Sequence, residues 1–256
     1  MKIHFFEEFP TQKNLKKAAL IKFPSVIYLA AKSLAEFNQL KKELKKINPR
    51  LEAGYWPIIN SSYWVSPFSN TSDLELLIQE LSINKKALKV MIDLELPFHH
   101  LKLFFKNICS FPKNKKLIKT IFSQAPQSHL EILTAEYPVL NRWTQKKLEW
   151  LGISYSVEKF PHKKIVMYYT SMIRTRFIAN KLKKYIVERS LILGKNLQVG
   201  LGTLAIGILG HEPILSSVQL DQDLIFLKKN KIDTAVIFRL GGLTPEYCLV
   251  IQKYIS

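Results

Sequence analysis

The sequence has few cysteines, few glycines and no long hydrophobic run, and each scarcity excludes a class of protein. Two cysteines among 256 residues cannot form a disulfide framework or a four-cysteine zinc site. Nine glycines and twelve prolines exclude a collagenous or low-complexity chain. No stretch reaches the roughly 18 apolar residues of a membrane helix, so we expect no transmembrane segment. The low cysteine content favours a cytoplasmic location.

Acidic residues are also scarce relative to basic ones. The chain has 38 Lys and Arg against 20 Asp and Glu, which gives a net charge of +18. Such an excess attracts polyanions such as nucleic acid or anionic lipid. The lysines are scattered over segments of helical character, which favours an ordinary solvated surface. Contact with a polyanion through these basic helices remains an alternative.

Short apolar runs rich in β-forming residues alternate with longer segments of helical period. Most of the runs are apolar nearly throughout, as expected for strands that are covered on both faces. The expected strands cover residues 3–9, 25–31, 51–58, 88–96, 129–137, 164–171, 197–204 and 234–240. Helix-capping motifs open several of the segments between them: Ser33 with Glu36, Ser72 with Glu75, Ser216 with Gln219, and Thr244 before Pro245.

Eight strands that alternate with eight helical segments predict a (β/α)8 TIM barrel, whose usual length is about 250 residues. A doubly wound open sheet uses the same alternation and is the alternative. There is no linker or break in composition, so we assign residues 1–256 to a single domain. Residues 152–162 form an extra piece before the sixth strand, and we expect this piece to lie over the barrel as a loop.

Acidic residues end several of the expected strands, which is where the active site of such a barrel lies. Asp93 and Glu95 end the fourth strand and share one face, because side chains alternate along a strand. Two carboxyl groups on one face repel, which raises the pKa of one and keeps it protonated for general acid catalysis. Glu136 ends the fifth strand. We predict Glu95 as the acid/base, Asp93 as its partner and Glu136 as a second carboxylate.

Each carboxyl group also has a structural interpretation. Asp93 could accept hydrogen bonds from backbone amides at the strand end, and Glu136 could form an ion pair with Arg239 at the end of the eighth strand. Glu7 and Glu8 are adjacent at the end of the first strand, so one of them must face away from the mouth.

Aromatic residues gather at the same strand ends, and their flat apolar faces with polar tips suit sugar rings. Tyr168 and Tyr169 point to opposite sides of their strand, so only one of them can reach the lumen. The aromatic residues expected at the rim are Tyr55, Trp56, Tyr63, Trp64, Tyr137, Tyr168 and Tyr169. We predict that the substrate is bound by Glu7, Tyr55, Trp56, Tyr169 and Arg239.

The segment Asp93-Leu-Glu95, together with Met167-Tyr-Tyr169 at the end of the sixth strand, resembles the chitinase-type barrels of glycoside hydrolase family 18. This resemblance implies that Glu95 is the proton donor and that Asp93 orients the substrate acetamido group. It also implies that Tyr168 or Tyr169 steadies the intermediate. Lysozyme barrels of family 25 likewise end a strand in an Asp-x-Glu pair.

The sequence departs from the chitinase pattern at three positions. Lys89 and Met91 stand where acidic or small residues are expected before Asp93, and Arg239 stands where a tryptophan usually ends the eighth strand.

The resulting hypothesis is a glycoside hydrolase-like barrel that acts on a glycan or glycoside and needs no cofactor. Glycosidases require two carboxyl groups across the scissile bond, which Glu95 and Glu136 could supply. One alternative is a metal-dependent sugar isomerase or lyase, with Glu95, Glu136 and His99 or His100 around a divalent ion. No histidine spacing is typical of a zinc finger or a metal-binding helix, so we assign no metal site. The other alternative is a non-catalytic barrel that binds a polyanion.

Overall fold

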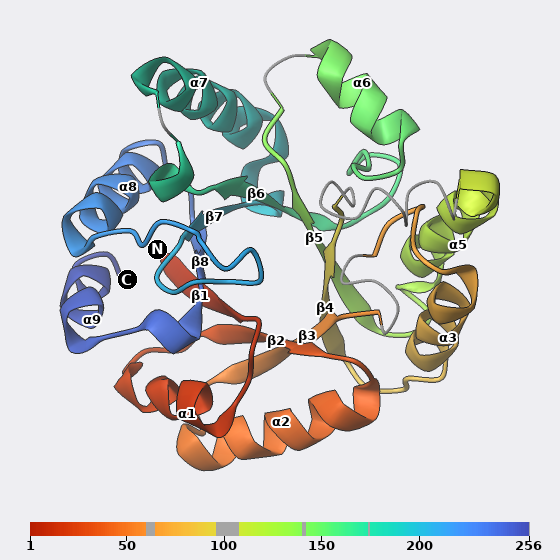
Figure 1. The fold of residues 1–256 in the computed structure, drawn as a ribbon, viewed down its shortest axis with the longest axis horizontal. Helices are drawn as coiled ribbons and strands as arrows, with labels where there is room; N and C mark the ends of the chain where they lie inside the picture. The colour runs from red at the N-terminus through yellow and green to blue at the C-terminus, as the bar shows by residue number, and fades with distance from the viewer. Residues whose placement is uncertain (60–64, 96–107, 140–141, 174, 256) are drawn as a thin grey trace.

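The strands of this chain close into a parallel barrel (Figure 1). A computed structural model describes residues 1–59, 65–95, 108–139, 142–173 and 175–255. The strands follow one another around the barrel in chain order, and β8 pairs with β1. They are β1 Lys2–Glu7, β2 Val26–Ala31, β3 Glu52–Pro57, β4 Leu88–Asp93, β5 Leu130–Glu136, β6 Lys163–Tyr168, β7 Leu197–Gly202 and β8 Thr234–Phe238.

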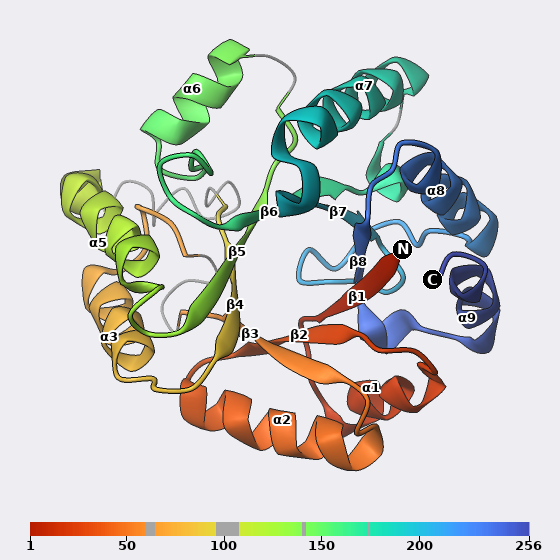
Figure 2. The same ribbon diagram turned by 180° about the vertical axis from the view of Figure 1, so that it is seen from behind.

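Helices surround the barrel, as seen from both ends in Figures 1 and 2. The α-helices are α1 Gln12–Leu15, α2 Leu34–Ile47, α3 Thr71–Ser82, α5 Phe111–Gln124, α6 Arg142–Trp150, α7 Arg176–Leu193, α8 Ser217–Lys229 and α9 Pro245–Gln252. Short 3-10 helices are η1 Lys16–Leu20, η2 Ile108–Ser110, η3 Thr170–Met172, η4 Gly194–Asn196 and η5 Leu240–Gly242. The (β/α)8 barrel predicted from the sequence is therefore confirmed. Within the described residues, no helix combines the length and the apolar character that crossing a membrane requires.

Most helix starts follow the capping motifs in the sequence. The Ser216 hydroxyl and the Gln219 side chain form a reciprocal capping box at α8, and Thr244 caps α9 ahead of Pro245. The predicted N-cap at Ser72 is wrong by two residues, because Asn70 is the N-cap and α3 begins at Thr71. The side chain of Asn70 accepts a hydrogen bond from the Ser72 amide at 2.9 Å and takes the capping position.

Alternation of side chains along the strands creates two separate apolar cores. One set faces outward and packs beneath the helices, as Ile3, Ile27 and Val90 do. The other set faces the lumen and includes Phe6, Tyr28, Trp56, Met91, Leu133, Ile165, Val236 and Phe238. The lumen of this barrel is therefore filled by side chains through its middle, and only its ends remain for other groups.

Charged residues of alternating sign occupy the N-terminal end of the lumen. Lys89 forms ion pairs with Glu52 and Glu131 on the two neighbouring strands, and Glu131 also pairs with Lys163. Lys89, Glu131 and Lys163 lie two positions before Met91, Leu133 and Ile165 of the lumen core, so they face the lumen. Glu52 faces the same side, because it pairs with Lys89. Lys89 therefore lies at the opposite end of β4 from Asp93.

The segment 152–162 does not lie over the barrel, and that expectation is wrong. It follows α6 and leads into the start of β6, so it runs along the outer wall. Ile153 and Tyr155 are buried there, and the Tyr155 ring lies 4.8 Å between centroids from the Phe122 ring on α5. The segment therefore contributes to the outer core.

Gly54 in β3 is expected to be intolerant of a side chain. A Cβ at this position would lie 2.4 Å from Cδ1 of Tyr28, whose ring is buried in the lumen. We expect Gly54→Ala to lower the free energy of unfolding by about 1–3 kcal/mol through overpacking. Gly200→Ala in β7 is the matched control, because its Cβ would meet no atom closer than 3.5 Å. Urea unfolding of both variants checks this, and equal stabilities would contradict it.

Candidate active site

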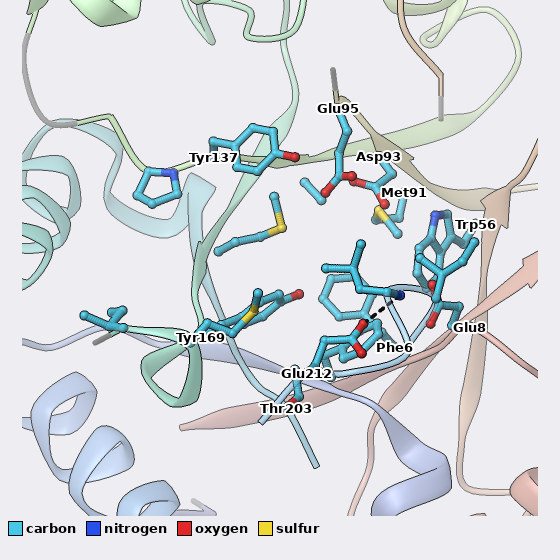
Figure 3. A pocket seen from close by; sticks show the side chains of 18 of the residues that line it. Phe6, Glu8, Trp56, Met91, Asp93, Glu95, Tyr137, Tyr169, Thr203 and Glu212 are labelled. Carbon is cyan, nitrogen blue, oxygen red and sulfur yellow. Dashed lines mark hydrogen bonds between the residues drawn. The ribbon is translucent and has the colours of Figure 1, made fainter. Parts of the chain in front are cut away.

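A cavity of about 300 Å³ opens at the C-terminal end of the barrel (Figure 3). Aromatic rings of Phe6, Trp56, Tyr137, Tyr169 and Phe238 form much of its wall. The remaining lining includes methionines from β4 and β6 and the β7–α8 loop. Its size lies at the lower end of the range of about 300–1,000 Å³ for small-molecule sites.

Asp93 and Glu95 lie side by side in this cavity (Figure 3). Asp93 is only 7% exposed, and its Oδ1 atom has no hydrogen-bond partner among the described residues. Burial raises the pKa of Asp93 well above its usual value, and the nearby Glu95 and Glu8 carboxyl groups raise it further. The predicted repulsion between two carboxyl groups on one face is therefore present in the structure.

Two tyrosines, each directly after the last residue of β5 or β6, face this carboxyl pair. Tyr137 is hydrogen-bonded to Glu95 and its hydroxyl points toward that side chain, while Tyr169 lies across the cavity (Figure 3). Burial raises the pKa of both phenols, and Asp93 and Glu95 raise them further, so both remain neutral. Tyr168 takes the opposite side, where its ring lies 5.9 Å from that of Phe226 on α8.

Glu8 and Glu212 also line the cavity, although neither was among the predicted site residues. The sequence analysis chose Glu7 rather than Glu8 as the substrate-binding residue, whereas in the structure Glu8 lines the cavity and Glu7 does not. Glu212 lies in the β7–α8 loop, where its carboxylate accepts the Leu209 amide at 3.0 Å and the His211 amide at 3.1 Å. A loop position has no strand period, so the sequence carried no signal for the direction of this side chain.

Glu136 does not reach the cavity, and we correct its expected position. It faces the outer side of β5, where its carboxylate accepts hydrogen bonds from Lys164 at 2.9 Å and from Ser154 at 2.6 Å. Burial raises the pKa of Glu136, but the Lys164 ammonium and the hydrogen bonds from Ser154 and Lys164 outweigh it and lower the pKa to about 2. The partner of Glu136 is thus Lys164 rather than Arg239.

Glu7 and Arg239 form an ion pair of 3.0 Å on the outer side of the rim, and neither lines the cavity. Arg239 also donates two hydrogen bonds to the Ile206 carbonyl, at 2.8 and 3.1 Å. Ile206 belongs to the β7–α8 loop, which supplies Ile208, Leu209 and Glu212 to the cavity. The geometry therefore gives Glu7 and Arg239 the role of holding this loop at the mouth.

Of the predicted aromatic residues in β3, Trp56 lines the cavity and Tyr55 does not. Tyr55 faces outward and packs against Phe37 of α2, with ring centroids 5.2 Å apart. Tyr63, Trp64, His99 and His100 lie outside the described residues. Within the described part of the chain, no group of three or more His, Cys, Asp or Glu side chains could hold a metal ion.

Asp93 should make stability depend on pH. Because the pKa of Asp93 is raised in the folded state, the contribution of Asp93 to stability is complete below the usual aspartate pKa. This contribution is lost as the pH rises through the pKa of the folded state. Asp93→Asn should therefore gain stability relative to the wild type as the pH rises above about 4, by at most about 1.4 kcal/mol per pH unit. Chemical denaturation at a series of pH values measures this. A difference that does not vary with pH would contradict it.

Glu136→Gln should act on stability, because it leaves the buried Lys164 ammonium without its counter-charge. We expect a loss of about 3–5 kcal/mol in the free energy of unfolding. Because the pKa of Glu136 is lowered in the folded state, the stability of the wild type should fall as the pH drops from the usual glutamate range toward about 2. The double variant Glu136→Gln/Lys164→Met should recover part of the loss. Unchanged stability of the single variant in urea would refute this placement.

Comparison with solved structures finds similar barrels in glycoside hydrolases and in an epimerase. The PgaB (BpsB) glycoside hydrolase domain from Bordetella bronchiseptica matches with a TM-score of 0.61 and 11% identity, covering 100% of this chain and 98% of that chain. A GH18 chitinase from Pseudoalteromonas aurantia matches with a TM-score of 0.61 and 9% identity over 100% of both chains. A D-allulose 3-epimerase from Methylomonas sp. has a TM-score of 0.57 and 12% identity, covering 100% of this chain and 98% of that chain.

Sequence comparison adds no closer relative. No protein-family model matches the chain, and no curated protein matches it significantly. Identities of about one residue in ten establish the fold and leave the activity to be argued from the site. The chain thus has a (β/α)8 fold with a remote resemblance to chitinase-like barrels.

Proposed function

We propose that this chain is a glycoside hydrolase-like enzyme that acts on a glycan or glycoside by carboxylate acid/base catalysis. The observation that carries the proposal is the pair Asp93 and Glu95, which share an aromatic-lined cavity at the catalytic end of the barrel. Glycoside hydrolases among the structurally similar proteins support the same class.

In this proposal, Glu95 is the catalytic acid. It is half-buried, whereas Asp93 lies deeper, so Glu95 is the member of the pair that a substrate can touch. Its carboxyl group would donate a proton to the glycosidic oxygen as the carbon–oxygen bond breaks. The resulting carboxylate would then take a proton from the water that completes hydrolysis.

Asp93 and Tyr137 would act through Glu95 as positioning residues. The negative charge of one carboxyl group favours protonation of the other, so the pair retains a proton that a single exposed carboxylate would lose. The hydrogen bond with Tyr137 fixes the direction of the Glu95 carboxyl group. Positive charge that develops on the sugar ring in the transition state would be stabilised by the acidic cavity.

Of the alternatives, the metal-dependent isomerase or lyase loses its proposed ligand set, because Glu95 and Glu136 lie on opposite faces of the barrel wall. Polyanion contact through the basic outer helices stays a prediction, as do the single domain and the cytoplasmic location. Lys45, Lys46, Lys228 and Lys229 are exposed on α2 and α8, where such contact would occur.

Glu95→Gln should abolish hydrolysis while the fold is retained. Loss of the transferable proton is expected to lower kcat by about 10²–10⁴-fold. The exposed control Glu158→Gln removes the same charge away from the cavity and should retain full activity. Release of reducing ends from a glycoside panel measures turnover, and circular dichroism checks the fold. Full activity of a folded Glu95→Gln protein would refute the assignment.

A further inference from the structure

We propose that the cavity recognises a positively charged ligand group, specifically the ammonium of an amine-bearing sugar, through Glu8, Asp93 and Glu212. That the ligand is a sugar rests on the proposed function; the preference for a positive charge goes beyond it.

The charge of the cavity is opposite to that of the protein. Its described lining includes four carboxyl groups, of Glu8, Asp93, Glu95 and Glu212, and no Lys, Arg or His side chain. The whole chain has a net charge of +18, but charges farther than about 10 Å through solvent are largely screened at 0.1 M salt. Among the described residues, these carboxyl groups are therefore the charges that a small cation inside the cavity would meet.

Asp93 supplies a hydrogen-bond acceptor that the described part of the protein leaves unused. Its Oδ1 atom is buried, has no partner among these residues and belongs to a side chain that faces the cavity (Figure 3). A buried acceptor without a partner costs free energy, commonly about 1–3 kcal/mol, until a donor reaches it. An ammonium group carries only donors and matches this requirement.

Glu8 and Glu212 converge on one point of the β7–α8 loop. A Cβ built on Gly207 would lie 2.8 Å from Oε1 of Glu212 and 2.9 Å from Oε2 of Glu8. Both carboxyl groups therefore approach the same point beside Gly207 from different segments of the chain. Glu212 accepts hydrogen bonds from two backbone amides of the loop, so its position is fixed before any ligand binds.

The aromatic walls suit a cation as well as a sugar ring. Trp56, Tyr169, Phe6 and Phe238 line the same cavity as the carboxyl groups. Faces of such rings attract ammonium groups, most strongly where water is excluded. An acetylated amine would offer neither charge nor a match for several carboxyl groups, so the cavity should discriminate between the two forms.

The test compares binding of three probes of equal length to the full chain. They are a β-linked glucosamine tetrasaccharide, its fully N-acetylated counterpart and the neutral glucose tetrasaccharide. Isothermal titration calorimetry at pH 6 should show the amine probe binding at least about tenfold more tightly than the other two. Raising the salt concentration should weaken binding of the amine probe alone.

Glu8→Gln isolates the carboxyl contribution. It should lower affinity for the amine probe about tenfold and leave affinity for the other two unchanged. Glu158→Gln is the matched control and should alter none of the three. Thermal unfolding checks that each variant is folded; if Glu8→Gln is not folded, the salt dependence of the wild type decides the question.

Equal binding of all three probes, preference for the acetylated probe, or no binding at all would overturn the inference. If Glu8→Gln lowers kcat on every substrate without changing the ratio of affinities, Glu8 serves the transition state and the inference fails while the proposed function stands. If the protein binds the amine probe selectively but hydrolyses no glycan, the inference stands and the proposed hydrolase function fails.

Discussion

The alternation of side chains in a closed parallel barrel is the constraint on which the rest of this structure depends. It sends every second residue of a strand into the lumen and the others beneath the helices. On β4 this parity puts Met91 in the lumen core and Asp93 at its C-terminal end, followed by Glu95. A carboxyl group that would otherwise be solvated is thereby held in an apolar space, and its pKa rises.

Charge is distributed in layers along the barrel axis. Ion pairs of alternating sign close the N-terminal end, apolar side chains fill the middle, and carboxyl groups surround the cavity at the C-terminal end. The surplus of lysine lies on the outside, where solvent and salt screen it. This separation lets a strongly basic protein maintain an acidic site, and it links the proposed acid catalysis to the preference for a cationic sugar.

The fold was predictable because each strand is an apolar run that can be identified from its own residues. The eight predicted runs correspond to β1 to β8. The sequence did not predict which residues of each strand face the lumen. Strands that are covered on both faces show no alternation of apolar and polar residues that would distinguish the lumen from the outer wall. Asp93 and Glu95 were correctly placed on one face. Tyr55 and Glu136 were assigned to the wrong face, and only knowledge of their partners, Phe37 and Lys164, could have corrected this.

Burial at the mouth of the barrel and the neighbouring Glu95 carboxylate together raise the pKa of Asp93. The most direct measurement is an NMR titration of the Asp93 side-chain carboxyl carbon in the wild type and in Glu95→Gln. We predict that Asp93 titrates well above the usual aspartate range and that its pKa falls when the Glu95 charge is removed. An ordinary aspartate pKa in both proteins would contradict the account.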